Sequence, residues 1–232
     1  MKKEVKILRY NPQIDGKPYY QEFEYEHMEG MTVLDILNQI YENVDSTLSY
    51  SHSCGNGHCG LCGVVVNGKA VLACKTPAVP GSTIEPLRNI SVVKDLVIDR
   101  EEYERKLPKL RLFLERQCAA AEEPEKIDME AFDKFKVASR CVECLCCVSV
   151  CPVFKKSPHL FEGPMAYILE ARHYYDPRDD LNRTLIYDTQ GVERCICETC
   201  DLCSRVCMHK VDPAGIMGDI KGTILKEREG DE

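Results

Sequence analysis

Tryptophan is absent from the 232-residue chain, and no stretch approaches the ~18 apolar residues that a membrane-spanning helix needs. Basic residues are outnumbered, 30 against 38 acidic ones, so the formal charge is −8. That balance argues against a nucleic-acid partner held mainly by counterion release. The opening MKKEVKILRYNP contains no apolar core of a secretory signal. We therefore expect a soluble cytoplasmic protein, whose association with the inner face of a membrane would be made through partners.

Cysteine, in contrast, is abundant. The chain has 15 cysteines, an odd number, and 14 of them fall in three tight groups. A disulfide framework is normally even-numbered and belongs to exported proteins. In a reducing compartment, thiols spaced two and three residues apart are more often metal ligands. The sequence therefore predicts metal binding.

The first part of the chain predicts a small mixed domain. Alternating side chains indicate strands near residues 5–10 and 19–25, and a capping-box pattern precedes a helix over 33–40. Asn67-Gly68 between two apolar segments is the strongest hairpin signal, because both turn residues tolerate positive φ. Strand, strand, helix and hairpin in this order predict a β-grasp sheet.

The second part of the chain predicts helices. Residues 101–121 are charged and leucine-rich but are interrupted by Pro108, which favours two helical pieces. Further helices are predicted over 129–139 and 165–175, and from Pro213 toward Lys226. These helices flank two cysteine-dense segments.

The first cysteine group predicts a [2Fe–2S] cluster. SCGNGHCGLCG followed by AVLAC has the spacing C-x4-C-x2-C-x11-C, which begins like that of plant-type ferredoxins. Soft thiolates suit iron bridged by sulfide. A four-cysteine zinc ribbon is the alternative, although it normally uses two C-x2-C knuckles farther apart. The predicted ligands are Cys54, Cys59, Cys62 and Cys74.

The other two groups predict two cubane clusters. RCVECLCCVSVCP contains C-x2-C-x2-C-x3-C-P, in which the fourth cysteine ligates the other cluster of a pair. The same spacing recurs near the C-terminus, with Met208 in place of the proline. Reciprocal exchange predicts one [4Fe–4S] cluster on Cys141, Cys144, Cys147 and Cys207, and a second on Cys151, Cys197, Cys200 and Cys203.

Three cysteines remain outside these sets. Cys118, Cys146 and Cys195 are interpreted as small buried or half-buried thiols, with Cys195 as a substitute ligand the alternative. Histidines near the clusters leave Rieske-like ligation conceivable, but each set already has four thiols. No phosphate loop, nucleotide fingerprint or nucleophile–base pair occurs, so we predict no catalytic residue and no substrate site on this chain.

These predictions combine into an α+β protein of two domains. Residues 1–100 are predicted to form a β-grasp domain of the plant-type ferredoxin kind, holding the [2Fe–2S] cluster. Residues 101–232 are predicted to form an all-helical domain of the bacterial two-cluster ferredoxin kind, holding both cubanes.

This arrangement resembles the iron–sulfur subunit of succinate dehydrogenase and fumarate reductase over nearly the whole chain. The resemblance rests on SCGNGHCGLCG…LAC, on CVECLCCVSVCP and on the second motif ending at Cys207. It implies an electron-transfer subunit of an oxidoreductase. Its partners would be an FAD-containing flavoprotein subunit and, on the acceptor side, a membrane anchor or a heterodisulfide-reductase-like subunit.

The sequence departs from the usual family pattern at three places. Cys200 stands where ordinary members have an aliphatic residue and hence a [3Fe–4S] cluster, so a complete [4Fe–4S] is expected here, with [3Fe–4S] the alternative. Lys155 and Lys156 lie where a quinone-binding tryptophan usually follows the Cys-Pro, and Glu198 replaces a frequent histidine. These differences resemble thiol-driven fumarate reductases. They argue against a conventional quinone site, and the expected acceptor is a quinone or a low-potential or thiol module.

Other functions are compatible with the same motifs. The chain could serve a related flavoprotein enoate reductase or a heterodisulfide reductase-like complex, since nothing in it contacts substrate. A zinc-stabilised interaction scaffold is the non-redox alternative. A stand-alone ferredoxin is disfavoured, because it needs neither this length nor two kinds of cluster domain.

Overall fold

The computed structural model describes residues 1–116, 128–189, 191–196 and 199–230. The chain divides into two units, one of Met1–Tyr103 with Val142–Val150, the other of Glu104–Cys141 with Cys151–Glu232. This division assigns Val142–Val150 to the first unit, whereas the sequence-based boundary assigns it to the second.

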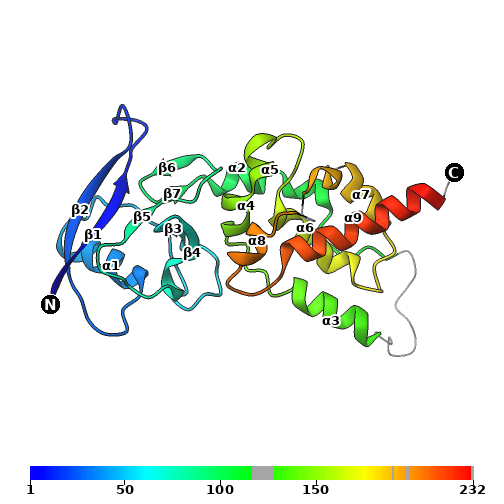
Figure 1. Cartoon of the computed structure of the whole chain (residues 1–232), viewed down its shortest axis with the longest axis horizontal. Coiled ribbons are helices and arrows are strands. Elements are labelled where there is room, and N and C mark those ends of the chain that lie inside the picture. The colour runs from blue at the N-terminus through cyan, green and yellow to red at the C-terminus, as the bar shows by residue number, and fades with distance from the viewer. Residues whose placement is uncertain (117–127, 190, 197–198, 231–232) are drawn as a thin grey trace. The chain divides into compact units, whose positions relative to one another are not determined.

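The first unit contains a five-stranded mixed sheet (Figure 1). Its strand order is β2-β1-β5-β3-β4, with β1 parallel to β5 and the other pairs antiparallel. The strands are β1 (Lys2–Arg9), β2 (Tyr19–Glu26), β3 (Gly63–Val66), β4 (Lys69–Leu72) and β5 (Thr83–Glu85). The remaining elements are α1 (Val33–Asn43), η1 (Ala73–Lys75), β6 (Val92–Lys94), β7 (Val97–Ile98), α2 (Arg100–Glu104) and α4 (Cys146–Val150), with α2 ending in the second unit.

Local sequence signals account for the elements of this unit that were predicted. The Thr32 side chain accepts from the Asp35 N–H while Asp35 accepts from the Thr32 N–H, so the capping box starting α1 is confirmed. Asn67 and Gly68 have φ of 48° and 81°, which confirms the tight turn between β3 and β4. The strands β5, β6 and β7 were not predicted, because each has only two or three residues.

The core of the first unit lies between the sheet and α1. Ile7 alternates with half-buried neighbours along β1, and Ile36 and Ile40 lie on the inner face of α1; all three are fully buried. A charged pair is also buried there, because Arg9 donates from Nε to Asp95 at 3.0 Å with both side chains under a tenth exposed.

Helices are the only regular secondary structure among the described residues of the second unit. They are η2 (Leu107–Leu110), α3 (Met129–Ala138), α5 (Pro152–Lys156), α6 (Pro164–Tyr174), α7 (Arg183–Thr189), η3 (Val192–Arg194), α8 (Leu202–Arg205) and α9 (Pro213–Gly230). Helix α6 is buried on all sides from Pro164 to Ala171 and packs against η2, α3, α7 and α9 (Figure 1). The predicted helices near 129–139, 165–175 and 213–226 are therefore confirmed.

The prediction of a second helical piece after Pro108 is wrong for the residues described. The short η2 ends at Leu110, Arg111 adopts a left-handed φ of 49°, and no helix follows through residue 116. The buried Arg183 guanidinium donates to the carbonyls of Leu110, Arg111 and Phe113. These carbonyls are satisfied by a side chain, so the segment has no need of helical hydrogen bonds.

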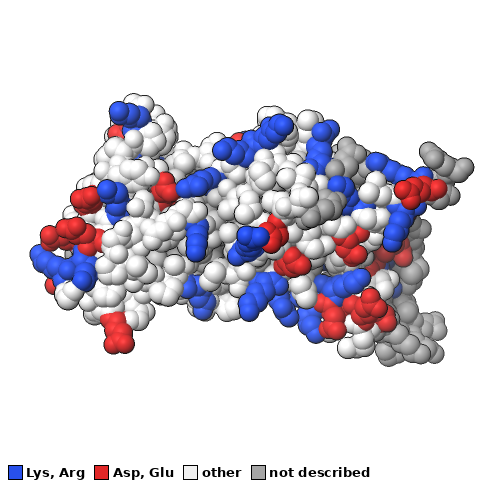
Figure 2. Space-filling view, viewed as in Figure 1, with Lys and Arg blue, Asp and Glu red and all other residues white. Residues whose placement is uncertain are grey.

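None of the helices described is long and apolar enough to cross a membrane. On the face of the molecule drawn in Figure 2, basic and acidic side chains are interspersed.

Candidate metal centres

The first candidate centre is the loop between α1 and β3 together with η1. The hairpin of β3 and β4 returns Cys74 to Cys62, and their sulfurs lie 3.3 Å apart, both buried. Cys54 is exposed and Cys59 is half-buried. The loop therefore presents two sulfurs toward the core and two toward its rim.

Backbone amides surround the sulfur of Cys54. It accepts from the N–H groups of His58 at 3.2 Å and Cys59 at 3.3 Å. Hydrogen bonds from Asn56, Cys59 and His58 lower the pKa of Cys54 to about 6. Burial instead raises the pKa of Cys62 to about 12, a cost that the positive charge of a bound iron would offset. A loop whose amides solvate thiolate sulfur suits an iron–sulfur cluster.

Two glycines bring this loop against the second cysteine group within the first unit. A Cβ on Gly60 would overlap the carbonyl oxygen of Val142, and Gly60 also has a φ of +70°. A Cβ on Gly63 would lie 2.9 Å from the Cys144 carbonyl oxygen. Only glycine permits this approach, so the backbones of the two cysteine motifs are in direct contact.

The four cysteines predicted to hold the first cubane are divided between the stretches of chain that form the two units. Cys144 and Cys147 belong to the first unit, and Cys141 and Cys207 to the second. Arg100 donates to the Glu143 carbonyl at 2.7 Å in the first unit. In the second unit, Arg172 donates to the Cys141 carbonyl at 2.6 Å. Each half of the motif is thus fixed by an arginine.

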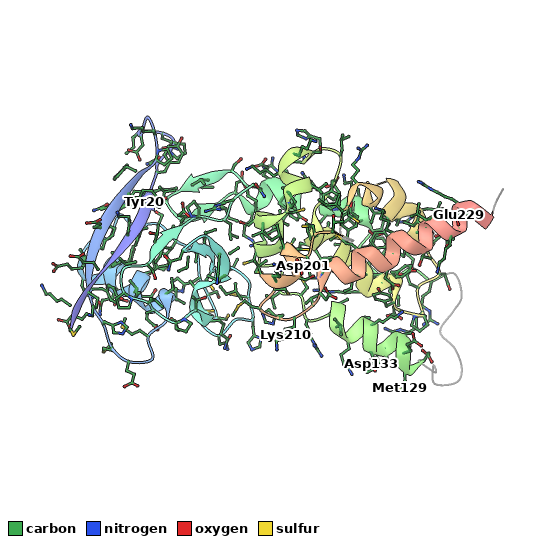
Figure 3. The ribbon with its side chains drawn as sticks, viewed as in Figure 1. Tyr20, Met129, Asp133, Asp201, Lys210 and Glu229 are labelled. Carbon is green, nitrogen blue, oxygen red and sulfur yellow. The ribbon has the colours of Figure 1, made fainter. Side chains whose placement is uncertain are left out.

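The second cubane set has its own cavity in the second unit. Cys151, Cys200 and Cys203 line one cavity, although they come from distant parts of the sequence. Cys195 lines it too, and Phe161, Pro164, Ile196, Leu202 and Met217 contribute to its apolar wall. Cys197, the fourth predicted ligand, lies outside the described residues, as do Cys118 and Glu198. Two residues labelled in Figure 3, Asp201 and Lys210, mark this end of the motif. Asp201 directly precedes α8, and Cys203 and Cys207 lie between the two labelled residues in the sequence.

Burial dominates the chemistry of this cavity. It raises the pKa of Cys203 to about 12 and raises that of Cys151, with the neighbouring cysteines adding to both shifts. The Cys151 sulfur nevertheless accepts from the Phe154 N–H at 3.4 Å, at the start of α5. Crowded thiols in an apolar cavity are costly to ionise, and a metal cluster supplies the positive charge that they lack. The residues present therefore fit a cubane.

The cysteines outside the predicted sets are not isolated. Cys146 is buried and forms a side-chain hydrogen bond with Cys144, which lowers the pKa of Cys144 to about 7. The sequence predicts a packing thiol at Cys195, with a substitute ligand as the alternative, and the fold places this residue in the cavity wall. Among the residues described, no three His, Cys, Asp or Glu side chains converge as ligands of a single ion would.

Comparison with family models defines the class of protein. The model of the 2Fe–2S iron–sulfur cluster binding domain matches residues 4–105, and that of the 4Fe–4S dicluster domain matches residues 137–211. The chain is an iron–sulfur protein with one domain of each kind.

Known relatives narrow the class further. A fumarate reductase (CoM/CoB) subunit of Methanothermobacter marburgensis is 36% identical over 91% of this chain, which spans 42% of that relative. The fumarate reductase iron–sulfur subunit of Mycobacterium tuberculosis is 35% identical over 94% of this chain and 91% of its own length. The succinate dehydrogenase iron–sulfur subunit of Coxiella burnetii is 30% identical over 97% and 98%.

A solved structure supports the same assignment at the level of fold. The chain matches one from the Mycobacterium smegmatis Sdh1 complex in the apo form with a TM-score of 0.85, at 22% identity, over 98% of this chain and 97% of that one. The chain belongs to the family of succinate dehydrogenase and fumarate reductase iron–sulfur subunits.

Proposed function

We propose that this chain is the electron-transfer subunit of a succinate dehydrogenase/fumarate reductase-type complex. It passes electrons between an FAD-containing flavoprotein subunit and an acceptor module through three iron–sulfur clusters. The domains are residues 1–100, a β-grasp domain, and residues 101–232. The parallel pairing of β1 with β5 at the centre of the sheet supports the β-grasp assignment.

Each cluster has a proposed set of four thiolates. Cys54, Cys59, Cys62 and Cys74 hold the [2Fe–2S] cluster; Cys141, Cys144, Cys147 and Cys207 hold the first [4Fe–4S] cluster; Cys151, Cys197, Cys200 and Cys203 hold the second. The bound clusters supply one-electron redox chemistry. The chain's own residues position them, donate amide hydrogen bonds to sulfur and exclude water.

One observation carries the proposal, namely the contact between the two cysteine motifs at Gly60 and Gly63. Electron transfer between clusters requires their ligand loops to be close and rigid. Backbone contact without intervening side chains meets that requirement. A zinc-stabilised scaffold has no need of it.

A thiol-linked or other low-potential acceptor is proposed over quinone. Cys200 lines the cavity with Cys151 and Cys203, as a fourth-iron ligand should. The relative from Methanothermobacter marburgensis is named a CoM/CoB fumarate reductase subunit. In the family that this chain resembles, a tryptophan after the Cys-Pro usually helps to bind quinone, and this chain contains no tryptophan.

Electron paramagnetic resonance on anaerobically purified protein, with iron and sulfide counted alongside, tests the cluster content. We expect a nearly silent oxidised sample, and on reduction one [2Fe–2S] and two interacting [4Fe–4S] signals. Stoichiometric zinc without sulfide would refute the redox function. A full three-iron signal in the oxidised sample would refute the role of Cys200 and restore a quinone-linked account.

The partner assignment is tested separately. Pull-down of the tagged chain from its native host under anaerobic conditions is expected to recover an FAD protein and the acceptor module, and the recovered complex should reduce fumarate with a dithiol donor. Fumarate reduction by the chain alone would contradict the proposal, as would activity of the recovered complex with quinol but not with dithiol.

A further inference from the structure

Glu170 is a buried carboxyl group that the electron-transfer chain does not use. It lies in the middle of α6, is fully buried, and neither of its carboxylate oxygens has a hydrogen-bond partner among the described residues. Buried polar groups are almost always hydrogen-bonded, because an unpaired one costs free energy and an unpaired charge costs far more. Such a carboxyl is a neutral acid or a group that changes charge during function.

The charged groups that act on Glu170 compensate its charge only in part. Arg183 in α7 favours the ionised form, and Asp179 opposes it. Arg183 is already paired with Asp179 at 2.6 Å, both side chains being 2% exposed, and it also donates to three backbone carbonyls. Its Nη1 and Nη2 groups are therefore engaged elsewhere, while its buried Nε has no hydrogen-bond partner among the described residues. Burial raises the pKa of Glu170 to about 8, the largest contribution.

Among the described residues, several charged or polar groups on the elements packed against α6 have partners of their own. Tyr187 in α7 is fully buried, donates its hydroxyl to the Tyr167 carbonyl at 3.0 Å, and is influenced by the charge of Glu170. These groups are engaged as follows: Asp219 of α9 with Tyr175, Lys221 of α9 with the Cys195 carbonyl, Lys134 of α3 with Glu130 and Asp219, Lys109 of η2 with Glu162, Arg172 of α6 with the Cys141 carbonyl, and His173 of α6 with Asp179.

Tyr167 connects Glu170 to the cavity of the second cubane set. Its ring stacks at 5.7 Å on Tyr187 and lies 5.2 Å from Phe161, which lines the cavity with Cys195. The charges that act on the Tyr167 hydroxyl are, in decreasing order, those of Glu162, Cys195 and Glu170. Glu170 and the cavity thus share one buried, apolar environment, in which charges interact more strongly than in water.

We propose that Glu170 is a proton-binding site coupled to the electron carried by the cluster on Cys151, Cys197, Cys200 and Cys203. This inference rests on the proposed function of that centre. When Glu170 is ionised, one-electron reduction of the cluster by the partner's reduced flavin adds negative charge to the shared environment. One solvent proton then binds a carboxylate oxygen of Glu170, forming an O–H bond. Oxidation of the cluster releases that proton.

The test is a redox titration of the intact protein or complex, followed by electron paramagnetic resonance at a series of pH values. The potential of the second cubane should be constant below about pH 8, where the acid is already protonated. Above that pH it should fall, by at most about 59 mV per pH unit for one electron and one proton. The [2Fe–2S] signal in the same sample should show no such slope.

Two variants locate the proton. In Glu170→Gln the potential should be independent of pH, because the isosteric amide does not ionise. Glu162→Gln is the matched control: this buried glutamate is paired with Lys109 and adjoins the cavity residue Phe161. Its replacement should displace the potential equally at every pH and keep the slope.

An independent readout needs no variant. The infrared difference spectrum between reduced and oxidised protein above pH 8 should contain the carbonyl stretch of a newly protonated carboxyl group. A pH-independent potential in protein with its full iron and sulfide overturns this inference alone, and so does a slope that survives in Glu170→Gln. Protein that lacks the second cubane overturns the proposed function, and this inference with it.

Discussion

The carbonyl oxygen of Cys144 lies 2.9 Å from the point where a Cβ on Gly63 would be. The same point is 2.8 Å from Cδ1 of Leu87, a fully buried side chain of the first unit. The start of β3 therefore has no room for a side chain. Because Gly63 has no Cβ, the backbone of the motif around Cys62 can contact the backbone of the motif around Cys144.

Replacing Gly63 by alanine should separate the two motifs. Overpacking of this kind typically costs about 1–3 kcal/mol of stability, and the distance between the two ligand loops should grow. The measurement is thermal unfolding, together with the magnetic interaction between the [2Fe–2S] and the first cubane. Gly16→Ala is the control, because nothing lies within 4 Å of its Cβ position and its φ is not positive. If the two variants had the same unfolding temperature and the same magnetic interaction between clusters, the contact at Gly63 would affect neither stability nor cluster spacing.

Replacing Cys200 by valine should convert the second cubane into a three-iron cluster. Cys200 lines the cavity with Cys151 and Cys203, and its thiolate is the proposed ligand of the fourth iron. The oxidised variant should show a three-iron resonance and one iron fewer per chain. Cys195→Ser, which alters the same cavity wall, should retain four irons. Iron loss from the Cys195 variant instead would make Cys195 the ligand.

Replacing Asp95 by asparagine should destabilise the first unit strongly. Asp95 is 3% exposed and accepts from Arg9 at 3.0 Å, as well as from the N–H groups of Tyr10 and Ser49. Removing the charge of a buried hydrogen-bonded group typically costs about 1–3 kcal/mol, and Arg9 keeps a second carboxylate partner, Asp45, at 2.7 Å. Glu24→Gln breaks only the exposed pair with Lys2 and should cost less than about 1 kcal/mol. Denaturant unfolding of both variants makes the comparison.

Acid should weaken the same region through Asp45. Hydrogen bonds from Thr47, and then from Arg9, lower the pKa of Asp45 from 3.8 to about 2. A depressed pKa stabilises the fold above the unfolded value, and that contribution is lost as the pH falls from about 4 to about 2. Asp45→Asn should therefore show a smaller loss of stability in this window than the parent protein. An unchanged acid titration of stability would contradict the assignment.

Glu170 should have the opposite pH dependence. Because its pKa is raised from 4.5 to about 8, the folded state binds more protons than the unfolded state between these values. The free energy of unfolding of the protein therefore falls as the pH rises from 4.5 to about 8, and it stays constant at higher pH. Glu170→Met, which keeps the volume without a charge, should be more stable at pH 8 by roughly 2–4 kcal/mol. Stability curves of the two proteins that run parallel across this range would exclude a buried titrating group.

Removal of iron should unfold much of the helical unit. Its cysteine segments are irregular or form helices of only four or five residues, such as α5 and α8, which ligand bonds would tie together. We expect chelation under oxidising conditions to lower the helical circular dichroism and expose the unit to protease. The sheet of the first unit has its own apolar core and should persist. A chelated sample of unchanged thermal stability would rule this out.

Sequence alone was sufficient for the features set by local chemistry. The spacing of the cysteines predicted the cluster classes that the family models match, because ligand spacing on a loop reflects cluster geometry. The capping box at Thr32 and the turn at Asn67-Gly68 depend on neighbouring residues only, and both are confirmed. Local sequence gave the wrong prediction after Pro108, where a helix was expected. Arg183, some seventy residues away in sequence, donates hydrogen bonds to the backbone carbonyls of that segment.

Tertiary structure decided what distant residues do together. Only the fold places Cys151 in one cavity with Cys195, Cys200 and Cys203. Only the fold brings the backbone of Gly63 into contact with that of Cys144. It also makes Glu170 an unpartnered buried acid, although its sequence context is that of an ordinary helical glutamate. Local sequence determines ligand type and turn geometry, whereas burial and charge compensation depend on neighbours that are distant along the chain.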